Sequence, residues 1–275
     1  LITDEELDEK IYEIRNNKNI RVVNINTLVN CDKKVPFTET NFDPDSDAMI
    51  YFTSGSTGEP KGVRITHRNY ISVIQNIMKL VPWPVNGVYA DYHDLSFVIS
   101  IPILFSCWLT QSAISPALAP EEIFLPIDNL KENKVNVLIT VPSTIARIKQ
   151  VRPNGIEGIN LDVIINCGEP LHLDVLDYSL QLAQNGKVFN FYGSTEVAPW
   201  TFYHHCKKGD SERFKSIGYA PIGTLLPGNV MAIDKETSEL KIKGPQITPG
   251  YLFADNSKQF IMENEERWYK TGDKV

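Results

Sequence analysis

Residues 53–62, Thr-Ser-Gly-Ser-Thr-Gly-Glu-Pro-Lys-Gly, carry side chains that could bind a phosphate group. This loop has four hydroxyl groups, three glycines and one lysine, Lys61, within ten residues. Glycines let backbone N–H groups turn toward an anion, hydroxyls add donors, and a lysine adds positive charge. The spacing matches neither a Walker loop nor a Gly-x-Gly-x-x-Gly dinucleotide motif. A flexible linker is the alternative, but the apolar residues before the loop and Pro60 beside Lys61 favour a phosphate-binding loop.

Three other polar segments follow later in the chain. Residues 190–196 read Asn-Phe-Tyr-Gly-Ser-Thr-Glu after an apolar run, and residues 269–273 read Tyr-Lys-Thr-Gly-Asp. Between them, residues 239–245 read Glu-Leu-Lys-Ile-Lys-Gly-Pro and lead to Gly250 and Tyr251. Taken alone, such segments have ordinary structural interpretations, namely a tight turn, a helix cap with a first-turn acid, or an acidic turn.

Together, and in their order along the chain, the four segments resemble those of the adenylate-forming superfamily. This superfamily contains acyl-CoA synthetases, luciferases and the adenylation domains of nonribosomal peptide synthetases. Residues 51–62 resemble its signature loop. The later segments resemble its Asn-x-Tyr-Gly-x-Thr-Glu, Gly-Glu-Leu…Gly-Tyr and Tyr-x-Thr-Gly-Asp blocks, with Ser238 in place of the usual first glycine. The resemblance covers most of the chain. It implies an adenylate-forming ligase that uses ATP and Mg²⁺ to join a carboxylic acid to AMP and releases pyrophosphate.

The same resemblance assigns roles to individual residues. Lys61, Thr195 and Glu196 are the expected catalytic residues, with Thr195 donating to the α-phosphate and Glu196 holding Mg²⁺. Such a hard cation prefers oxygen ligands. Tyr192 is expected to stack on adenine and Asp273 to accept from both ribose hydroxyls. The expected nucleotide-binding residues are Thr53, Ser54, Gly55, Ser56, Thr57, Gly58, Lys61, Gly168, Glu169, Asn190, Tyr192, Gly193, Ser194, Thr195 and Asp273.

Residues 92–96, Tyr-His-Asp-Leu-Ser, resemble the Phe-Asp-x-Ser block of adenylation domains that take amino acids, with His93 in place of Phe. In that block the aspartate pairs with the α-ammonium of the substrate. An ammonium buried in an apolar pocket needs a carboxylate partner, whereas a fatty or aryl acid does not. We therefore expect Asp94 to be a buried carboxylate that selects amino acids, and a helix cap is the alternative interpretation.

The walls of the substrate pocket are expected from their positions relative to the family blocks. Phe189 and Phe191 alternate on one strand face, which would crowd the pocket and favour a small or flat substrate side chain, although core aromatics need no function. The expected substrate-binding residues are Asp94, Val98, Asn166, Cys167, Phe189 and Phe191, with Gly168 beside them.

The resemblance leaves three functions open. The first is activation of an amino acid followed by transfer to the phosphopantetheine thiol of a carrier protein. The second is an acyl- or aryl-CoA ligase of the same superfamily. The third is a non-catalytic nucleotide-binding scaffold, against which the presence of Lys61, Thr195, Glu196 and Asp273 argues.

Strands that alternate with helices predict an α/β fold, with layered and mostly parallel sheets covered by packed helices. A smaller β-rich lobe is expected at the C-terminal end, so that residues 1–200 form a partial nucleotide- and substrate-binding core and residues 201–275 the lobe. Thr66 is the expected N-cap of a helix, and Ser143 of another. Expected helices are 4–18, 66–80 and 173–184, expected strands are 20–25, 48–52, 135–141, 163–165, 187–191, 230–233 and 239–243, and residues 31–46 are an expected loop.

Composition limits the class of protein. The 275 residues are 42% hydrophobic and 22% charged, which excludes collagen, coiled coil and wholesale disorder. The net charge of −7 without a basic run argues against a nucleic-acid partner. Residues 95–120 lack charge but contain three prolines, so a buried core element is expected rather than a membrane span. Widely spaced cysteines predict reduced, buried thiols in a cytoplasmic protein, and adjacent His204 and His205 do not predict a metal site.

By resemblance, a whole enzyme of this superfamily has more chain before the signature loop, and a mobile C-terminal domain whose lysine contacts the adenylate. The present sequence ends two residues after Asp273. We therefore expect residues 1–275 alone to bind nucleotide but to adenylate poorly. Exchange of pyrophosphate into ATP measures this, and a rate equal to that of the whole enzyme would contradict it.

Overall fold

The computed structural model describes residues 2–3, 23–24, 41–53 and 60–275, and the chain divides into the units 1–42 and 43–275. In the first unit, β1 (Ile2–Thr3) pairs in parallel with β2 (Val23–Asn24), which confirms part of the strand expected at 20–25. The expected helix at 4–18, Cys31 and the loop residues Ser54, Gly55, Ser56, Thr57 and Gly58 lie outside the described residues.

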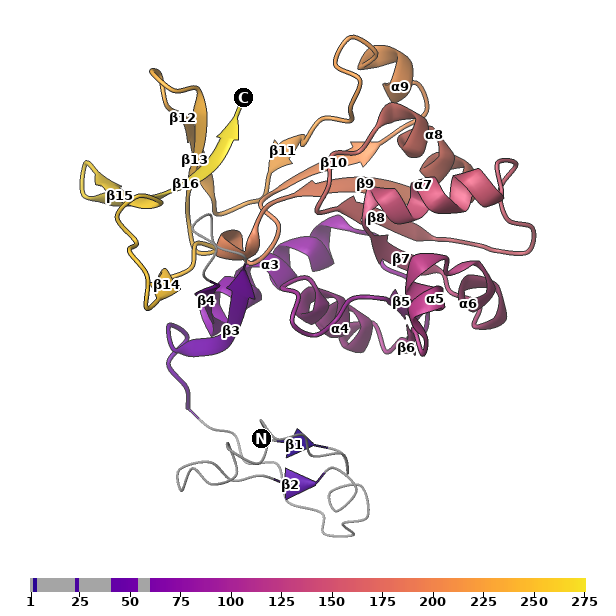
Figure 1. Ribbon diagram of the computed structural model, residues 1–275, viewed down its shortest axis with the longest axis horizontal. Coiled ribbons are helices and arrows are strands. Elements are labelled where there is room, and N and C mark those ends of the chain that lie inside the picture. The colour runs from indigo at the N-terminus through magenta and orange to yellow at the C-terminus, as the bar shows by residue number, and fades with distance from the viewer. Residues whose placement is uncertain (1, 4–22, 25–40, 54–59) are drawn as a thin grey trace. The chain divides into compact units, whose positions relative to one another are not determined.

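A seven-stranded sheet forms the body of the second unit (Figure 1). Five neighbouring strands run parallel, and two antiparallel strands extend one edge. The order is β11-β10-β9-β8-β7-β5-β6. The bounds are β5 (Val88–Asp91), β6 (Ala113–Pro116), β7 (Val137–Thr140), β8 (Val163–Cys167), β9 (Lys187–Tyr192), β10 (Phe202–Cys206) and β11 (Thr224–Leu225). The expected α/β fold with a mostly parallel sheet is confirmed.

Helices cover both faces of this sheet, because its central strands are apolar on both faces. Ile139 and Ile165 pack in one buried cluster with residues of α3 and α4, while Leu138 and Ile164 pack in another with residues of α7 and α8. The helices are α3 (His67–Leu80), α4 (Ser100–Leu109), α5 (Pro120–Phe124), α6 (Ile127–Glu132), α7 (Pro142–Val151), α8 (Leu173–Leu182) and α9 (Asp210–Arg213).

A small antiparallel sheet carries Thr53 and Lys61, which flank the glycine-rich segment. Its order is β14-β4-β3, with β3 (Asp47–Thr53), β4 (Lys61–Thr66) and β14 (Tyr251–Leu252). Thr53 pairs with Lys61 across β3 and β4. The sequence reading placed Lys61 in irregular structure and missed β4, so this expectation was wrong: β4 pairs with strands on both sides.

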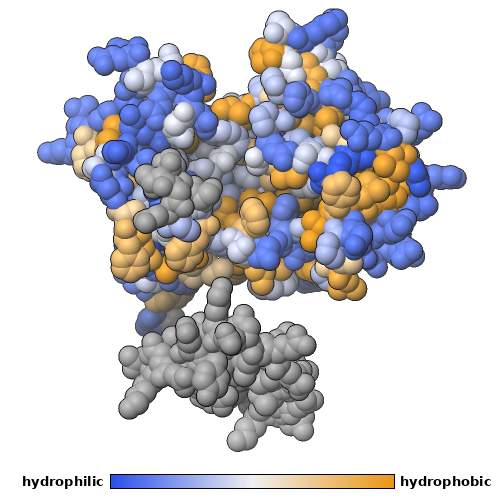
Figure 2. Space-filling view, in the orientation of Figure 1, coloured by the Kyte–Doolittle hydropathy of each residue, from blue (hydrophilic) through white to orange (hydrophobic). Residues whose placement is uncertain are grey.

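A four-stranded antiparallel sheet forms a lobe near the C-terminal end, in the order β12-β13-β16-β15. Its strands are β12 (Val230–Ile233), β13 (Glu239–Lys243), β15 (Phe260–Glu263) and β16 (Glu266–Lys274). The expected hairpin at 230–243 is confirmed. Figure 2 shows this face of the molecule hollowed between that lobe and the body. The domain boundary expected at residue 200 stays a prediction. The strands β10 and β11 lie after that residue and belong to the large sheet.

Two local expectations need correction. α4 buries Cys107, but Phe105, Trp108 and Leu109 remain 42%, 58% and 59% exposed, so segment 95–120 is only partly buried. Ser143 does not cap α7, because its hydroxyl and its backbone N–H both donate to Glu169.

Within the described residues, the helices are too short or too polar to cross a bilayer.

The start of α3 matches its prediction. Thr66 accepts a hydrogen bond from the backbone N–H of Asn69, and the Asn69 side chain accepts one from the N–H of Thr66, which is a capping box. The Asn69 amide also donates to Pro245 O and Ile247 O. The cap therefore attaches the start of α3 to the segment that leads into β14.

We expect Thr66→Ala to destabilise the protein by about 1 kcal/mol, the usual cost of removing an N-cap hydroxyl. Urea unfolding followed by circular dichroism measures the change. Thr224→Ala, at an exposed position in β11, is the matched control and should change the midpoint little. Equal midpoints for Thr66→Ala and the wild type would show that the cap does not stabilise α3.

Candidate active site

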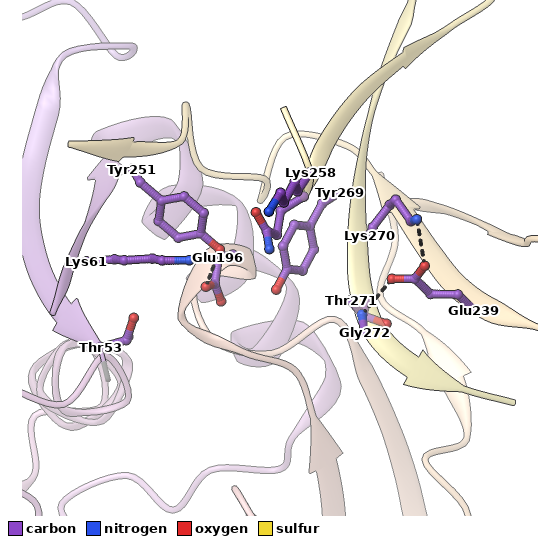
Figure 3. A pocket seen from close by; sticks show the side chains of 11 residues that line it. Thr53, Lys61, Glu196, Glu239, Tyr251, Lys258, Tyr269, Lys270, Thr271 and Gly272 are labelled. Carbon is purple, nitrogen blue, oxygen red and sulfur yellow. Dashed lines mark hydrogen bonds and ion pairs between the residues drawn. The ribbon is translucent and has the colours of Figure 1, made fainter. Parts of the chain in front are cut away.

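A polar cavity of about 240 Å³ lies where segments far apart in the sequence meet (Figure 3). It is formed by the ends of β3 and β4, the short helix η1 (Thr195–Val197), β14 with the loop after it, β13 and β16. We call it the first cavity. Its lining residues are Thr53, Lys61, Glu196, Glu239, Tyr251, Lys258, Gln259, Tyr269, Lys270, Thr271 and Gly272.

Glu196 is held at the wall of the first cavity by two hydrogen bonds. The phenol of Tyr251 donates to Glu196 Oε1 at 2.9 Å, and the backbone N–H of Thr248 donates to Glu196 O at 2.9 Å. Figure 3 shows the Glu196 carboxylate directed toward the ends of the Tyr251 and Tyr269 rings. One oxygen of this carboxylate is therefore fixed by a phenol.

Lys61 contacts the same tyrosine at a different place. Its Nζ lies 5.1 Å from the centroid of the Tyr251 ring, within the range of a cation–π contact. Lys61 occupies this position because β4 pairs with β14, in the register that places Tyr251 opposite Val63. One aromatic side chain therefore contacts both an ammonium and a carboxylate at the wall of the first cavity.

The other end of the first cavity is closed by a second pair of charges. Lys270 Nζ lies 2.9 Å from Glu239 Oε2, and this hydrogen bond raises the pKa of Lys270. The backbone N–H of Gly272 donates to Glu239 Oε1 at 2.9 Å. Lys258 is exposed on the loop after β14. The lining thus carries three lysines and two glutamates, an excess of positive charge that favours an anionic ligand.

A second cavity of about 440 Å³ lies at the carboxyl ends of β8 and β9. This edge is the usual ligand position on an open parallel sheet, and the volume falls within the range of small-molecule sites. Three of its residues are aromatic. The lining residues are Gly168, Glu169, Pro170, Leu171, Asn190, Phe191, Tyr192, Gly193, Tyr219, Ala220, Ile222 and Asp273.

The two cavities adjoin along two pieces of backbone. Gly272 lines the first and Asp273 the second, while Gly193 of the second precedes Glu196 of the first by one short turn. The Tyr192 phenol donates a hydrogen bond to Asp273 Oδ2, which connects β9 with β16. The described nucleotide-binding candidates that line a cavity are therefore divided between two adjoining cavities.

Gly193 is required by close packing. A Cβ at this position would lie 2.0 Å from Pro199 O, far inside contact distance, so the turn between β9 and η1 accepts glycine alone. Gly168 has φ +80°, a left-handed conformation that lets the chain leave β8 at the second cavity. Both glycines shape backbone at the edge of the parallel sheet.

The structure brings together most of the predicted nucleotide-binding residues that it describes. Thr53, Lys61 and Glu196 line the first cavity. Ser194 and Thr195 form the turn between the cavities, where Ser194 Oγ lies 3.3 Å from Tyr269 Oη. The residues at the second cavity are Gly168, Glu169, Asn190, Tyr192, Gly193 and Asp273.

The expected substrate-binding residues are not brought together in the same way as the nucleotide-binding residues. Asp94 is exposed, and its carboxylate accepts from the backbone N–H of Ser96 at 2.8 Å, which lowers its pKa. The expectation of a buried carboxylate was therefore wrong, because a local turn satisfies Asp94 at the surface.

Of the expected pocket walls, Gly168 and Phe191 line the second cavity, and the other four line neither cavity. Asn166, Cys167 and Phe189 are 0%, 1% and 3% exposed, and burial raises the pKa of the Cys167 thiol to about 12. Phe189 packs between Phe191 and His205. Val98 is also buried. These side chains belong to the core of the described structure, the alternative that the sequence left open for the aromatics.

Several residues of the cavities had no assigned role in the sequence reading. Tyr251 and Tyr269 stand in family-like blocks, so the sequence did contain a signal for them. Lys258 and Tyr219 lie in stretches without any such block. Tyr219 packs against His172 with ring centroids 4.4 Å apart and offers an aromatic surface at the second cavity.

The donor set fits Mg²⁺ better than a transition metal. Among the described residues, no group of three His, Cys, Asp or Glu side chains is arranged to hold a metal ion. Mg²⁺ is commonly held by one or two carboxylates together with substrate phosphates and water. Glu196, with one oxygen fixed by Tyr251 and a cationic lysine nearby, offers such a single carboxylate ligand.

Comparisons with known proteins agree with this geometry. The sequence model of a family described as "AMP-binding enzyme" matches residues 3–252. A D-alanine–D-alanyl carrier protein ligase of Bacillus cytotoxicus is 28% identical over 253 residues, which are 87% of this chain and 50% of that protein. The chain spans about half the length of the curated relatives it matches.

Solved structures share the fold. The Vibrio cholerae adenylation domain AlmE, in complex with glycyl-adenosine-5'-phosphate, matches with a TM-score of 0.75 and 24% identity over 84% of this chain and 46% of that one. An O-succinylbenzoate coenzyme A synthetase from Bacillus subtilis, in complex with ATP and magnesium, matches with a TM-score of 0.72 and 18% identity over 98% and 58%.

We expect Gly193→Ala to destabilise the protein by about 2 kcal/mol or more, since the added methyl must displace backbone. Urea unfolding measures stability, and calorimetry measures the accompanying loss of ATP binding. Gly158→Ala is the control, because Gly158 has φ +83° but no atom within 4 Å of the added Cβ. If the two variants lost equal stability, the packing argument for Gly193 would fail.

Proposed function

The chain belongs to the AMP-binding enzyme family, and from this premise we propose that the protein activates an amino acid as its adenylate, with release of pyrophosphate. The observation that carries the proposal is the meeting of Lys61 and Glu196 at one cavity, directly beside a second cavity that holds Tyr192 and Asp273. This arrangement suits a ligand that is a phosphate chain at one end and a nucleoside at the other.

In the proposed reaction, a carboxylate oxygen attacks the α-phosphorus of ATP, and the bond to the pyrophosphate oxygen breaks. The protein's contribution is to position two anions and to offset the developing charge. Lys61 stabilises phosphate charge in the first cavity, and Glu196 would hold Mg²⁺ there. Bound Mg²⁺ supplies further positive charge at the phosphates.

The nucleoside is proposed to occupy the second cavity. The Tyr192 ring offers a stacking surface for adenine, and Asp273 accepts hydrogen bonds from the ribose hydroxyls. A carboxylate can accept about four hydrogen bonds. The bond from the Tyr192 phenol to Asp273 therefore leaves capacity for ribose and fixes the carboxylate at the cavity mouth.

An amino acid is proposed as the substrate because the relative described above is a D-alanine ligase. By analogy with that relative, we propose an amino acid with a small side chain. Asp94 follows β5, whose carboxyl end lies at the same edge of the parallel sheet as those of β8 and β9. Its exposed carboxylate is accessible to a ligand at that edge and is our proposed partner for the substrate ammonium.

A carrier-protein thiol is the proposed acceptor of the activated acyl group, again from the relative's name. Since the reaction consumes ATP, we propose that the protein works in the cytoplasm. The cysteines of the described residues, Cys107, Cys167 and Cys206, are free thiols.

The substrate proposal predicts a difference between matched acids. The full-length protein should exchange pyrophosphate into ATP faster with D-alanine, L-alanine or glycine than with the des-amino acids propionate and acetate. Asp94→Ala should slow exchange with the amino acid by up to about fivefold, because the ammonium loses an exposed charged partner, and should leave the des-amino rate unchanged.

Each failure has a separate meaning. A preference for the des-amino acid would contradict amino-acid activation and favour an acyl-CoA ligase. An absence of ATP binding in calorimetry would contradict the proposed reaction and favour a non-catalytic scaffold built on the same fold.

A further inference from the structure

Tyr251 is the side chain that connects the two charged residues of the first cavity, and neither the sequence reading nor the comparisons assign it a role. It is 8% exposed and lies in β14, which pairs with β4 and follows β13 in the chain. Its hydroxyl contacts Glu196 and its ring contacts Lys61.

The backbone around Tyr251 is fixed on both sides. Asn256 Oδ1 accepts from the N–H of Tyr251 at 2.7 Å, and the Asn256 amide donates back to Tyr251 O at 3.2 Å. A Cβ at Gly250 would lie 2.4 Å from Asn256 Oδ1, so the preceding residue must be small for this side chain to reach. The position of the tyrosine is thus set by a built turn and by pairing with β4.

The ring is also fixed. Phe260 packs edge-on against Tyr251 with centroids 5.5 Å apart, and in a tilted arrangement against Tyr269 with centroids 5.3 Å apart. The guanidinium of Arg267 lies 4.3 Å from the Phe260 ring centroid and donates to Thr248 O and Pro249 O. The Tyr251 ring therefore has little freedom to rotate away from Glu196.

The phenol is the donor in its contact with Glu196, because an ionised carboxylate can only accept hydrogen bonds. The hydrogen bond from the phenol holds Glu196 Oε1, and the Tyr269 phenol also interacts with this carboxylate. Such a bond to an ionised acceptor is stronger than one between neutral groups.

We propose that Tyr251 is a positioning residue for the metal and phosphate site, which orients the Glu196 carboxylate toward a divalent cation and holds the Lys61 ammonium over its ring beside the phosphates. The inference rests on the proposed function for the identity of its ligands. It adds that cation affinity depends on a phenol that acts through the Glu196 carboxylate.

Tyr251→Phe in the full-length protein tests the hydroxyl separately from the ring. We expect the half-saturating Mg²⁺ concentration for pyrophosphate exchange to rise about tenfold, the usual effect of losing a hydrogen bond to a charged group, while the KM for the amino acid stays unchanged. Mn²⁺ titrated in the presence of a non-hydrolysable ATP analogue, with free Mn²⁺ read by electron paramagnetic resonance, should show the same loss of affinity without any turnover.

Tyr251→Leu removes the ring as well, and should additionally weaken binding of the ATP analogue because Lys61 loses its contact. Tyr178→Phe is the matched control. Tyr178 is also buried, and its phenol donates to Arg152 O away from both cavities. This control should keep wild-type Mn²⁺ affinity, and thermal unfolding of all variants shows that they are folded.

Equal Mn²⁺ affinity for wild type and Tyr251→Phe would overturn the positioning role, whether or not exchange occurs. A loss of affinity equal to that of Tyr178→Phe would also overturn it, because the effect would then be one of general stability. Absence of exchange in the wild type with every acid would instead contradict the proposed function, and the Mn²⁺ titration would still decide the role of Tyr251.

Discussion

The candidate site depends on keeping an ammonium and a carboxylate available in one cavity without letting them neutralise each other. A direct ion pair between Lys61 and Glu196 would satisfy both charges and leave neither for a ligand. Tyr251 gives each a weaker partner, the ring face for Lys61 and the hydroxyl for Glu196. At the opposite end of the cavity, Lys270 and Glu239 do pair directly, and that pair serves to connect β13 with β16.

These charges lie close together only if the two small sheets are held in fixed positions relative to the large sheet. Two buried amides help to set that junction. The Asn69 side chain joins α3 to Pro245 and Ile247, and the Gln246 side chain donates to Val197 O and Trp200 O beside η1. The hydrogen bond from Tyr192 to Asp273 adds a contact at the cavity mouth. Movement of the C-terminal lobe relative to the parallel sheet would therefore change both cavities together.

The sequence predicted the elements better than the site. The apolar runs at 163–165 and 187–191 are buried strands, as predicted. The N-cap at Thr66 could be predicted from the sequence because capping is a local interaction. The strand β4 was missed because it directly follows a glycine-rich loop and its partners lie elsewhere in the chain. The exposure of Asp94 was missed because a local hydrogen bond to Ser96 satisfies its carboxylate without a substrate. Phe189 and Phe191 show why pocket walls were hard to predict, since alternation along a strand is the same for a core face and a cavity face.

If the two adjoining cavities bind one nucleotide, a crystal structure of the full-length protein with a non-hydrolysable ATP analogue and Mg²⁺ will show it directly. We expect the adenosine in the second cavity, with Asp273 on the ribose, and the phosphates in the first cavity between Lys61 and a Glu196-bound metal ion. A nucleotide bound elsewhere, or phosphates that contact neither Lys61 nor the metal on Glu196, would contradict it.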